Sequence, residues 1–203
     1  INLPEIRGEY SFDVDLSKFS LFGVGGKADV VFYPKDKEDL SNFLKNKDKN
    51  IQIFTIGVGS NLLIRDGGIR GVVIVLKKYM NSINLNSDDT ITVEAGVLDS
   101  KLFSFCKENG IAGYEFIGTI PGTVGGAIKM NAGCYGSSTS DFIIKITAID
   151  FDGNIKEFKK EECGFEYRKN GLPEDLIFIG AIFDAKNKAS TEEIDNKFRE
   201  YTK

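Results

Sequence analysis

Apolar residues in the first third of the chain switch between strand-like and helix-like spacing. Residues 29–33 (DVVFY) are β-branched and aromatic and precede a proline, so they predict a strand that ends there. Residues 37–46 carry leucine and phenylalanine at helical spacing, and residues 51–56 form an apolar run typical of a buried strand. This order predicts a β-α-β unit, and residues 61–76, with a glycine-pair turn, complete a first lobe over residues 1–80.

Polar residues 77–89 mark the boundary to a second lobe, which we place at residues 81–203. Residues 90–94 and 176–184 alternate or cluster apolar side chains over strand-like lengths. Both segments therefore predict strands of the second lobe.

Two helices are predicted in the second lobe from their end signals. Asp99 or Ser100 can cap a helix that runs to Asn109, and Gly110 stands where a left-handed glycine commonly ends a helix. A Ser-Thr-Glu-Glu capping box starts the last helix, which is predicted over residues 191–201.

The turn signals favour an antiparallel arrangement in the second lobe. Residues 142–150 and 154–158 flank Asp152–Gly153, a strong signal for a tight hairpin. Strands outnumber helices and do not alternate with them regularly, so we predict an α+β fold in two lobes rather than a doubly wound sheet.

The composition is typical of a globular protein and argues against nucleic-acid and membrane partners. Hydrophobic residues make up 41% of the 203 residues and charged residues 28%, which is typical of a globular chain. The net charge of −4 has the wrong sign for phosphate neutralisation, so no nucleic-acid partner is expected. No apolar run reaches the ~20 residues of a membrane span, and residues 1–10 lack a signal pattern. We expect a cytoplasmic monomer without a membrane partner.

Cysteine and histidine content excludes several chemistries. The three cysteines are widely spaced without a CxxC pattern, which indicates neither a disulfide framework nor a zinc site. Histidine is absent, which excludes Ser-His-Asp and Cys-His catalysis and His-coordinated zinc in this chain. We predict no metal site.

Three glycine-rich segments carry the candidate chemistry. Residues 22–28 match a dinucleotide fingerprint by letter, but a strand follows where that motif needs a helix, so a plain turn is favoured. In residues 56–63 (IGVGSNLL), Gly57 and Gly59 permit unusual backbone angles, and consecutive N–H groups can bind an anion. The alternative for this segment is an ordinary strand-to-turn connection.

The third glycine-rich segment, residues 116–136, combines glycines with apolar side chains and contains no acidic residue. Such a segment is expected to be buried against another group, where backbone amides suit a diphosphate and small apolar side chains suit a flat ring. The alternative is a close-packed glycine turn inside the core.

Four segments in their order resemble the UDP-N-acetylenolpyruvoylglucosamine reductase family, and specifically its shorter second type. They are residues 56–63 (IGVGSNLL), 65–72 (RDGGIRGV), 116–136 (FIGTIPGTVGGAIKMNAGCYG) and 163–168 (CGFEYR). The resemblance implies an FAD-binding fold of the vanillyl-alcohol oxidase-like (PCMH) type. It also implies that a C-terminal substrate-binding domain, which supplies a serine proton donor and a glutamate, is absent from residues 1–203.

The resemblance implies roles for individual residues. Arg168 matches the catalytic arginine, which suits stabilisation of a carboxylate because a guanidinium stays charged and binds it through two hydrogen bonds. The cofactor-binding residues implied by the same matches are Gly57, Gly59, Ser60, Asn61, Leu62, Gly118, Ile120, Pro121, Gly122, Thr123, Gly125, Gly126, Asn131, Gly133 and Tyr135.

The implied reaction is reduction of enolpyruvyl-UDP-N-acetylglucosamine to UDP-N-acetylmuramate in peptidoglycan precursor synthesis. FAD is the implied cofactor and NADPH the implied co-substrate. The cofactor carries out the hydride transfer, and the protein binds and orients it. Because no proton donor can be assigned in residues 1–203, we expect flavin binding with little or no turnover by this chain. The alternatives are a flavin- or nucleotide-binding module without redox activity and another oxidase of the flavoprotein superfamily.

Overall fold

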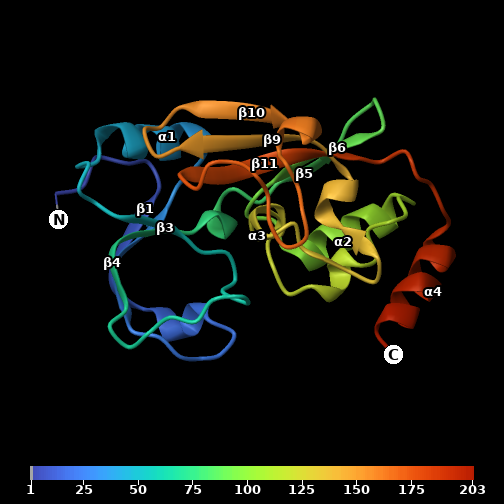
Figure 1. The fold of residues 1–203 in the computed structure, drawn as a ribbon, viewed down its shortest axis with the longest axis horizontal. Helices are drawn as coiled ribbons and strands as arrows, with labels where there is room; N and C mark the ends of the chain where they lie inside the picture. Colours follow the sequence, from blue (N-terminus) through green and yellow to red (C-terminus); the bar gives the residue numbers. More distant parts are fainter. Residues whose placement is uncertain (1) are drawn as a thin grey trace.

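The computed structural model describes residues 2–203 and contains two main sheets, which form two lobes side by side (Figure 1). The first sheet has the strand order β1-β2-β4-β3. In it β1 is antiparallel to β2, whereas β2, β4 and β3 run parallel. Its strands are β1 (Glu9–Asp15), β2 (Lys27–Tyr33), β3 (Ile53–Thr55) and β4 (Ile69–Ile74).

Helix α1 (Lys37–Asn46) has the bounds that its sequence predicts. It begins at the cap Asp36, whose carboxylate accepts a hydrogen bond from the backbone N–H of Asp39. Its apolar face packs on β2 through the rings of Phe32 and Phe43, whose centroids are 4.7 Å apart. The apolar spacing in this helix therefore encoded both its length and its packing face.

Two features of the first lobe differ from the sequence-based expectation. The strand expected over residues 51–56 is shorter, and β3 is not buried, since Phe54 and Thr55 are exposed. The reason is topological, because β3 is an edge strand of its sheet. Strand β1 was not predicted at all, although Tyr10, Phe12 and Val14 show period-two alternation.

The second sheet is entirely antiparallel, with the order β10-β9-β11-β6-β5. The predicted Asp-Gly hairpin is confirmed, and Gly153 adopts φ +85° in the turn that joins β9 to β10. The long strand β11 lies at the centre of the sheet. The strands are β5 (Ile83–Leu85), β6 (Thr90–Glu94), β9 (Ile143–Asp150), β10 (Ile155–Lys159) and β11 (Leu176–Asp184).

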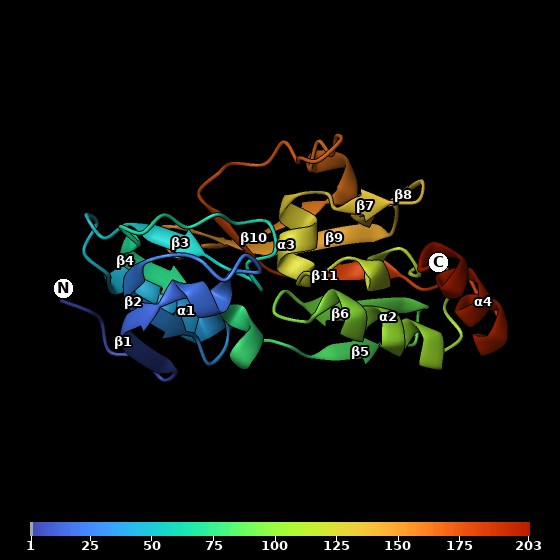
Figure 2. The same cartoon turned by 90° about the horizontal axis from the view of Figure 1, so that it is seen from below.

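The helices of the second lobe agree with their predicted ends, with one correction. Gly110 follows α2 (Asp99–Glu108) at φ +64°, and the capping box of Ser190 starts α4 (Thr191–Tyr201). The expected cap at Asp99 or Ser100 is wrong, because Leu98 is the N-cap and Asp99 is the first helical residue, with a buried side chain. Helix α4 lies at the end of the molecule remote from the N-terminus (Figure 2).

Short elements complete the second lobe. The six-residue helix α3 (Val124–Lys129) was not predicted, since its two glycines are poor helix formers. The remaining elements are the strands β7 (Gly133–Cys134) and β8 (Ser137–Ser138) and the 3-10 turns η1 (Leu16–Phe19), η2 (Leu76–Lys78), η3 (Ile117–Thr119), η4 (Thr139–Asp141) and η5 (Lys160–Glu162).

One apolar cluster joins the two lobes. It contains Phe32 and Phe43 from the first lobe and Ile149 and Ile177 from the second, all at most 1% exposed. The hydroxyl of Ser41 on α1 also donates to the carbonyl oxygen of Gly153 at 2.6 Å. Because burial of each such side chain is worth roughly 1.5–3 kcal/mol, the shared cluster fixes the lobes relative to each other.

Two classes of feature are missing from the part of the chain that the structure describes. No helix there has the length and apolarity needed to cross a bilayer. Likewise, residues 2–203 bring together no three side chains of the metal-binding types His, Cys, Asp and Glu in one metal-sized group.

Candidate functional site: a cavity between the two lobes

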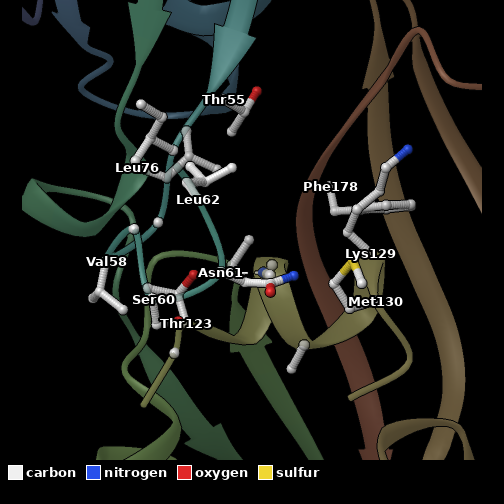
Figure 3. Close-up of a pocket in the computed structure, with 18 of the residues that line it drawn as sticks. Thr55, Val58, Ser60, Asn61, Leu62, Leu76, Thr123, Lys129, Met130 and Phe178 are labelled. Carbon is white, nitrogen blue, oxygen red and sulfur yellow. Dashed lines mark hydrogen bonds between the residues drawn. The ribbon is translucent and has the colours of Figure 1, made fainter. Parts of the chain in front are cut away.

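A cavity of about 960 Å³ lies where the two sheets meet. This volume is at the upper end of the roughly 300–1,000 Å³ found for small-molecule and cofactor sites. One wall consists of β3 and the loop of residues 57–62, and the facing wall contains α3 and the start of β11 (Figure 3). Of the residues predicted from sequence, it is lined by Gly57, Gly59, Ser60, Asn61, Leu62, Ile120, Pro121, Gly122, Thr123, Gly125, Gly126 and Arg168.

The loop of residues 57–62 offers a row of free backbone donors. None of its six N–H groups donates a hydrogen bond to another group within residues 2–203. Gly59 adopts φ +66°, and a Cβ atom there would lie 1.6 Å from the carbonyl oxygen of Phe19, so only glycine allows this turn. Gly57 keeps an ordinary φ, contrary to the expectation that both glycines take unusual angles. Consecutive unpaired N–H groups form a concavity suited to an anion.

The glycine-rich segments of residues 56–63 and 116–136 contact each other directly. A Cβ atom on Gly57 would lie 2.5 Å from the hydroxyl oxygen of Thr123, so glycine at this position lets the segments touch. The N–H of Val124 donates to Val97 and that of Gly125 to Ala95, which fixes the second segment against the end of β6. Segments that are about 60 residues apart in sequence thereby line one cavity.

Arg168 lies at the tip of a tight turn at the cavity. The backbone N–H and carbonyl groups of Glu166 and Lys169 close this turn, and Arg168 adopts φ +59°. Its guanidinium carbon lies 5.6 Å from the centre of the Tyr167 ring, and no carboxylate of residues 2–203 lies within ion-pair distance. A strained arginine beside a cavity, with no acidic partner in the described part of the chain, is available to bind an anionic ligand.

Two cationic side chains that were not singled out from the sequence also line the cavity. Lys129, at the end of α3, forms an ion pair with Glu174 at 2.6 Å, and both residues belong to the cavity wall. Lys77 lines it from the first lobe. With Arg168, the cavity therefore has more basic than acidic side chains, although the chain as a whole has a net charge of −4.

Four residues predicted to bind the cofactor lie outside the cavity lining. Gly118 faces the ring of Phe103, and Gly133 lies in the small β7–β8 hairpin. Asn131 is 7% exposed and donates through Nδ2 to the carbonyl oxygen of Glu166 at 3.0 Å, so it tethers the turn that carries Arg168. Tyr135 stacks on Tyr201, with ring centres 4.2 Å apart.

Asp99 is the cavity residue that sequence reasoning assigned to a different role. It was considered as a helix cap, yet it is 1% exposed and lines the cavity. Neither of its carboxyl oxygens has a hydrogen-bond partner within the described residues. Burial raises the pKa of this carboxyl to about 8, so the group is mostly protonated at neutral pH. A buried polar group without a partner costs about 1–3 kcal/mol, which calls for a partner from outside the chain.

Comparison with known proteins accounts for this architecture. The crystal structure of UDP-N-acetylenolpyruvylglucosamine reductase from Thermus caldophilus superposes with a TM-score of 0.83 at 30% sequence identity, over 98% of this chain and 69% of that protein. The chain belongs to the UDP-N-acetylenolpyruvoylglucosamine reductase family. Reductases of this name from Rickettsia bellii and Rickettsia typhi are 45% and 48% identical over 96% and 95% of the chain. The chain spans 64% of the length of each of these two reductases.

Residues 28–159 match the FAD binding domain family, so the chain carries an FAD-binding domain. Glucooligosaccharide oxidase from Acremonium strictum shares the fold, with a TM-score of 0.66 at 18% identity over 89% of this chain and 41% of that protein. These matches confirm the predicted α+β FAD-binding fold of the vanillyl-alcohol oxidase-like type.

The cavity residues fit FAD in shape and chemistry. The unpaired N–H groups of residues 57–62 suit the cofactor's diphosphate, and the N–H groups of Gly122 and Thr123 likewise donate to no group within residues 2–203. Leu176 and Phe178, the latter drawn in Figure 3, provide apolar wall for a flat ring. Unlike a solid core, the cavity offers polar groups that a bound ligand can satisfy.

Proposed function

We propose that this chain is the FAD-binding portion of an enzyme that reduces enolpyruvyl-UDP-N-acetylglucosamine to UDP-N-acetylmuramate, with NADPH as the electron donor. The product is a peptidoglycan precursor. The observation that carries the proposal is one cavity in which the amides of residues 57–62 have no partner, and Arg168 no acidic partner, among residues 2–203. Family membership is consistent with both features.

Each part of the cavity has a role in this proposal. The loop of residues 57–62 would hold the diphosphate, and the segment of residues 120–126 would line the rest of the cofactor. Bound FAD supplies hydride transfer, which no side chain can perform. Arg168 would bind the substrate carboxylate through its fixed fork of donors and stabilise the negative charge that develops there during reduction.

Arg168 cannot also supply the proton that completes the reduction, because a guanidinium stays protonated in proteins. Histidine is absent from the chain, and the Cys134 and Tyr135 side chains are engaged with Phe116 and Tyr201. We therefore propose that residues 1–203 bind flavin and accept electrons from NADPH but turn over little or no substrate by themselves.

Flavin titration of a matched glycine pair tests the proposed cofactor site. Gly59→Ala would place a Cβ atom 1.6 Å from a backbone oxygen, whereas the same change at Gly67 meets no atom within 4 Å. We expect Gly59→Ala to abolish FAD binding, measured by quenching of flavin fluorescence, and Gly67→Ala to leave it unchanged. Equal FAD affinity in both variants would remove this cavity as the site.

Anaerobic addition of NADPH to the flavin-loaded chain separates the proposed enzyme from a binding module. Loss of the yellow flavin absorbance supports the reductase. A coloured protein that NADPH does not bleach supports a flavin-binding module without redox activity. Robust steady-state reduction of enolpyruvyl-UDP-N-acetylglucosamine by residues 1–203 would contradict the proposed lack of a proton donor.

A further inference from the structure

The carboxyl group of Asp99 lies in the cavity wall, and both of its buried oxygens lack a hydrogen-bond partner within residues 2–203. Its backbone N–H donates to the carbonyl oxygen of Gly122 at 3.1 Å, so the main chain of the residue is satisfied and only the side chain is not. The side chain of Asp99 makes no capping hydrogen bond at the start of α2, although it lies in the first turn.

Gly122 makes room for this carboxyl group. A Cβ atom on Gly122 would lie 2.3 Å from Oδ2 of Asp99, so the carboxyl occupies the space where any larger residue would place its side chain. Both residues line the cavity. The carboxyl thus packs against the segment of residues 120–126, next to the amides of Gly122 and Thr123, which also have no partner among the residues that the structure describes.

We infer that Asp99 is a cofactor-binding residue whose carboxylic acid group donates a hydrogen bond to an oxygen atom of the bound FAD. This inference rests on the proposed function, because it requires FAD to occupy this cavity. The ribityl hydroxyls, the ring carbonyls and the diphosphate of FAD all present oxygen acceptors. A neutral acid can donate to any of them, whereas an ionised carboxylate can only accept and would repel the diphosphate.

The surroundings of Asp99 keep it neutral. Its pKa rises to about 8 through burial, without a neighbouring charge that would favour ionisation. On α2 and the elements packed around it, Glu94 accepts a hydrogen bond from Ser82, Lys101 donates to Asn81, and Lys107 pairs with Asp195. The charged side chains that share the cavity wall with Asp99 are Lys77, Lys129, Arg168 and Glu174.

FAD affinity as a function of pH tests the inference on the whole 203-residue chain. In the wild type, the apparent Kd should rise on going from pH 6.5 to pH 9 and approach a tenfold increase for each further pH unit above the pKa. Asp99→Asn keeps a donor of the same shape and cannot ionise, so its Kd should stay within about threefold of wild type at pH 6.5 and should not change with pH. Any pH dependence that Asp99→Asn still shows comes from the lysines or from the cofactor itself and is subtracted from the wild-type profile.

Asp99→Ala removes the donor altogether. The loss of one hydrogen bond should weaken FAD binding roughly fivefold at pH 6.5 and abolish the difference between pH 6.5 and pH 9. A merely structural Asp99 would shift the thermal unfolding midpoint of the cofactor-free chain and leave FAD affinity unmoved. If wild type, Asp99→Asn and Asp99→Ala share one Kd and one pH profile, the inference is overturned while the proposed function stands.

A different result would overturn both proposals together. If the wild-type chain does not bind FAD at either pH, neither the cavity nor Asp99 is a cofactor site. The Gly59→Ala comparison identifies that case, because it then also shows no effect. Failure of the inference alone and failure of the proposed function therefore give different patterns.

Discussion

Two buried aspartates show how differently the two lobes treat the same side chain. Asp39 in the first lobe is 2% exposed and accepts hydrogen bonds from the backbone N–H groups of Arg7, Gly8 and Lys35, at 2.8–2.9 Å. Asp99 is 1% exposed, and its carboxyl accepts no hydrogen bond from any group of residues 2–203. The hydrogen bonds of Asp39 connect three segments of the chain and stabilise the first lobe. The unpaired carboxyl of Asp99 lowers the stability of the second lobe.

The difference extends beyond the two side chains. Around Asp39 the polar groups are satisfied inside the chain, as is usual in folded proteins. Around the cavity the amides of residues 57–62, the carboxyl of Asp99 and the guanidinium of Arg168 all lack partners within residues 2–203. Unsatisfied polar groups that cluster in one cavity indicate a ligand site, because a bound ligand can supply the missing partners.

The largest expected effect in this comparison is the loss of stability when Asp39, the hydrogen-bonded aspartate, is replaced. Asp39→Ala removes three hydrogen bonds to a carboxylate and should lower the free energy of unfolding by about 3 kcal/mol or more. Urea denaturation of the cofactor-free chain measures this loss. Gly67→Ala, in an exposed turn with no atom near the added methyl group, is the matched control and should unfold like the wild type. A small effect of Asp39→Ala would remove the contrast between the two aspartates.

The next largest effect is on chemistry rather than on folding. Arg168 is exposed and has no ion-pair partner among the described residues, so Arg168→Lys should change the free energy of unfolding by less than about 0.5 kcal/mol. In the proposed reaction the same change should lower kcat roughly 100- to 1,000-fold, since lysine cannot form two parallel bonds to a carboxylate. Steady-state kinetics of the complete enzyme, of which this chain is proposed to be the FAD-binding portion, would check the change in kcat. Urea denaturation of the same protein would check the change in the free energy of unfolding.

Stability measured between pH 6 and 8 tests the third and smaller effect. The pKa of Asp99 rises from 3.8 to about 8 on folding, so the folded state binds a proton that the unfolded state releases. The free energy of unfolding should therefore be highest below about pH 4 with respect to this group and fall until about pH 8, by at most ~1.4 kcal/mol per pH unit. Since the chain has no histidine, few other groups titrate between pH 6 and 8.

Asp99→Asn is the control for this slope. It cannot titrate, so its free energy of unfolding should be flat between pH 6 and 8, while that of the wild type declines. Parallel curves for the two proteins would show that Asp99 is ionised or solvated in the folded state. Denaturant midpoints at half-unit pH steps give sufficient resolution.

The smallest expected effect concerns the Lys129–Glu174 pair at the cavity wall. Lys129 donates to Glu174, whose pKa is thereby lowered, but the Glu174 side chain is 89% exposed and screened by water. Glu174→Gln should leave stability unchanged and, by freeing Lys129, raise FAD affinity about twofold at low salt. The gain should vanish at high salt, and a large gain that persists there would show that Glu174 acts by contact rather than by charge.

Sequence reasoning worked best where local physics decides the conformation. The bounds of α1, the Asp-Gly hairpin and the capping box of α4 follow from side-chain spacing and from bonds made within a few residues. It was less successful where the environment decides. Strand β3 looked buried by composition but is an edge strand, and α3 has a glycine pair that hides its helical character.

The candidate site divides in the same way. Twelve of the sixteen predicted site residues line the cavity. Among them, Gly59 is required by its positive φ, whereas Gly57 and Gly122 leave space for the side chains of Thr123 and Asp99. Tyr135 and Asn131 lie in the same motif but outside the cavity, because sequence proximity does not show which way a side chain points. Lys129 and Asp99 were missed because one charged residue in a sequence resembles any other until its neighbours are known.

The sequence by itself determined where the backbone must turn tightly and which residues carry charge, because glycine conformation and ionisable groups are properties of single residues. Only the tertiary structure decided which of those groups are left without partners. Two lobes joined by a common apolar cluster bring residues 57–62 and 120–126 into contact, and they bury Asp99 beside them. Whether a polar group is hydrogen-bonded depends on all its neighbours in space. For that reason, the unpaired groups that suit a polar ligand can be identified only in the folded chain.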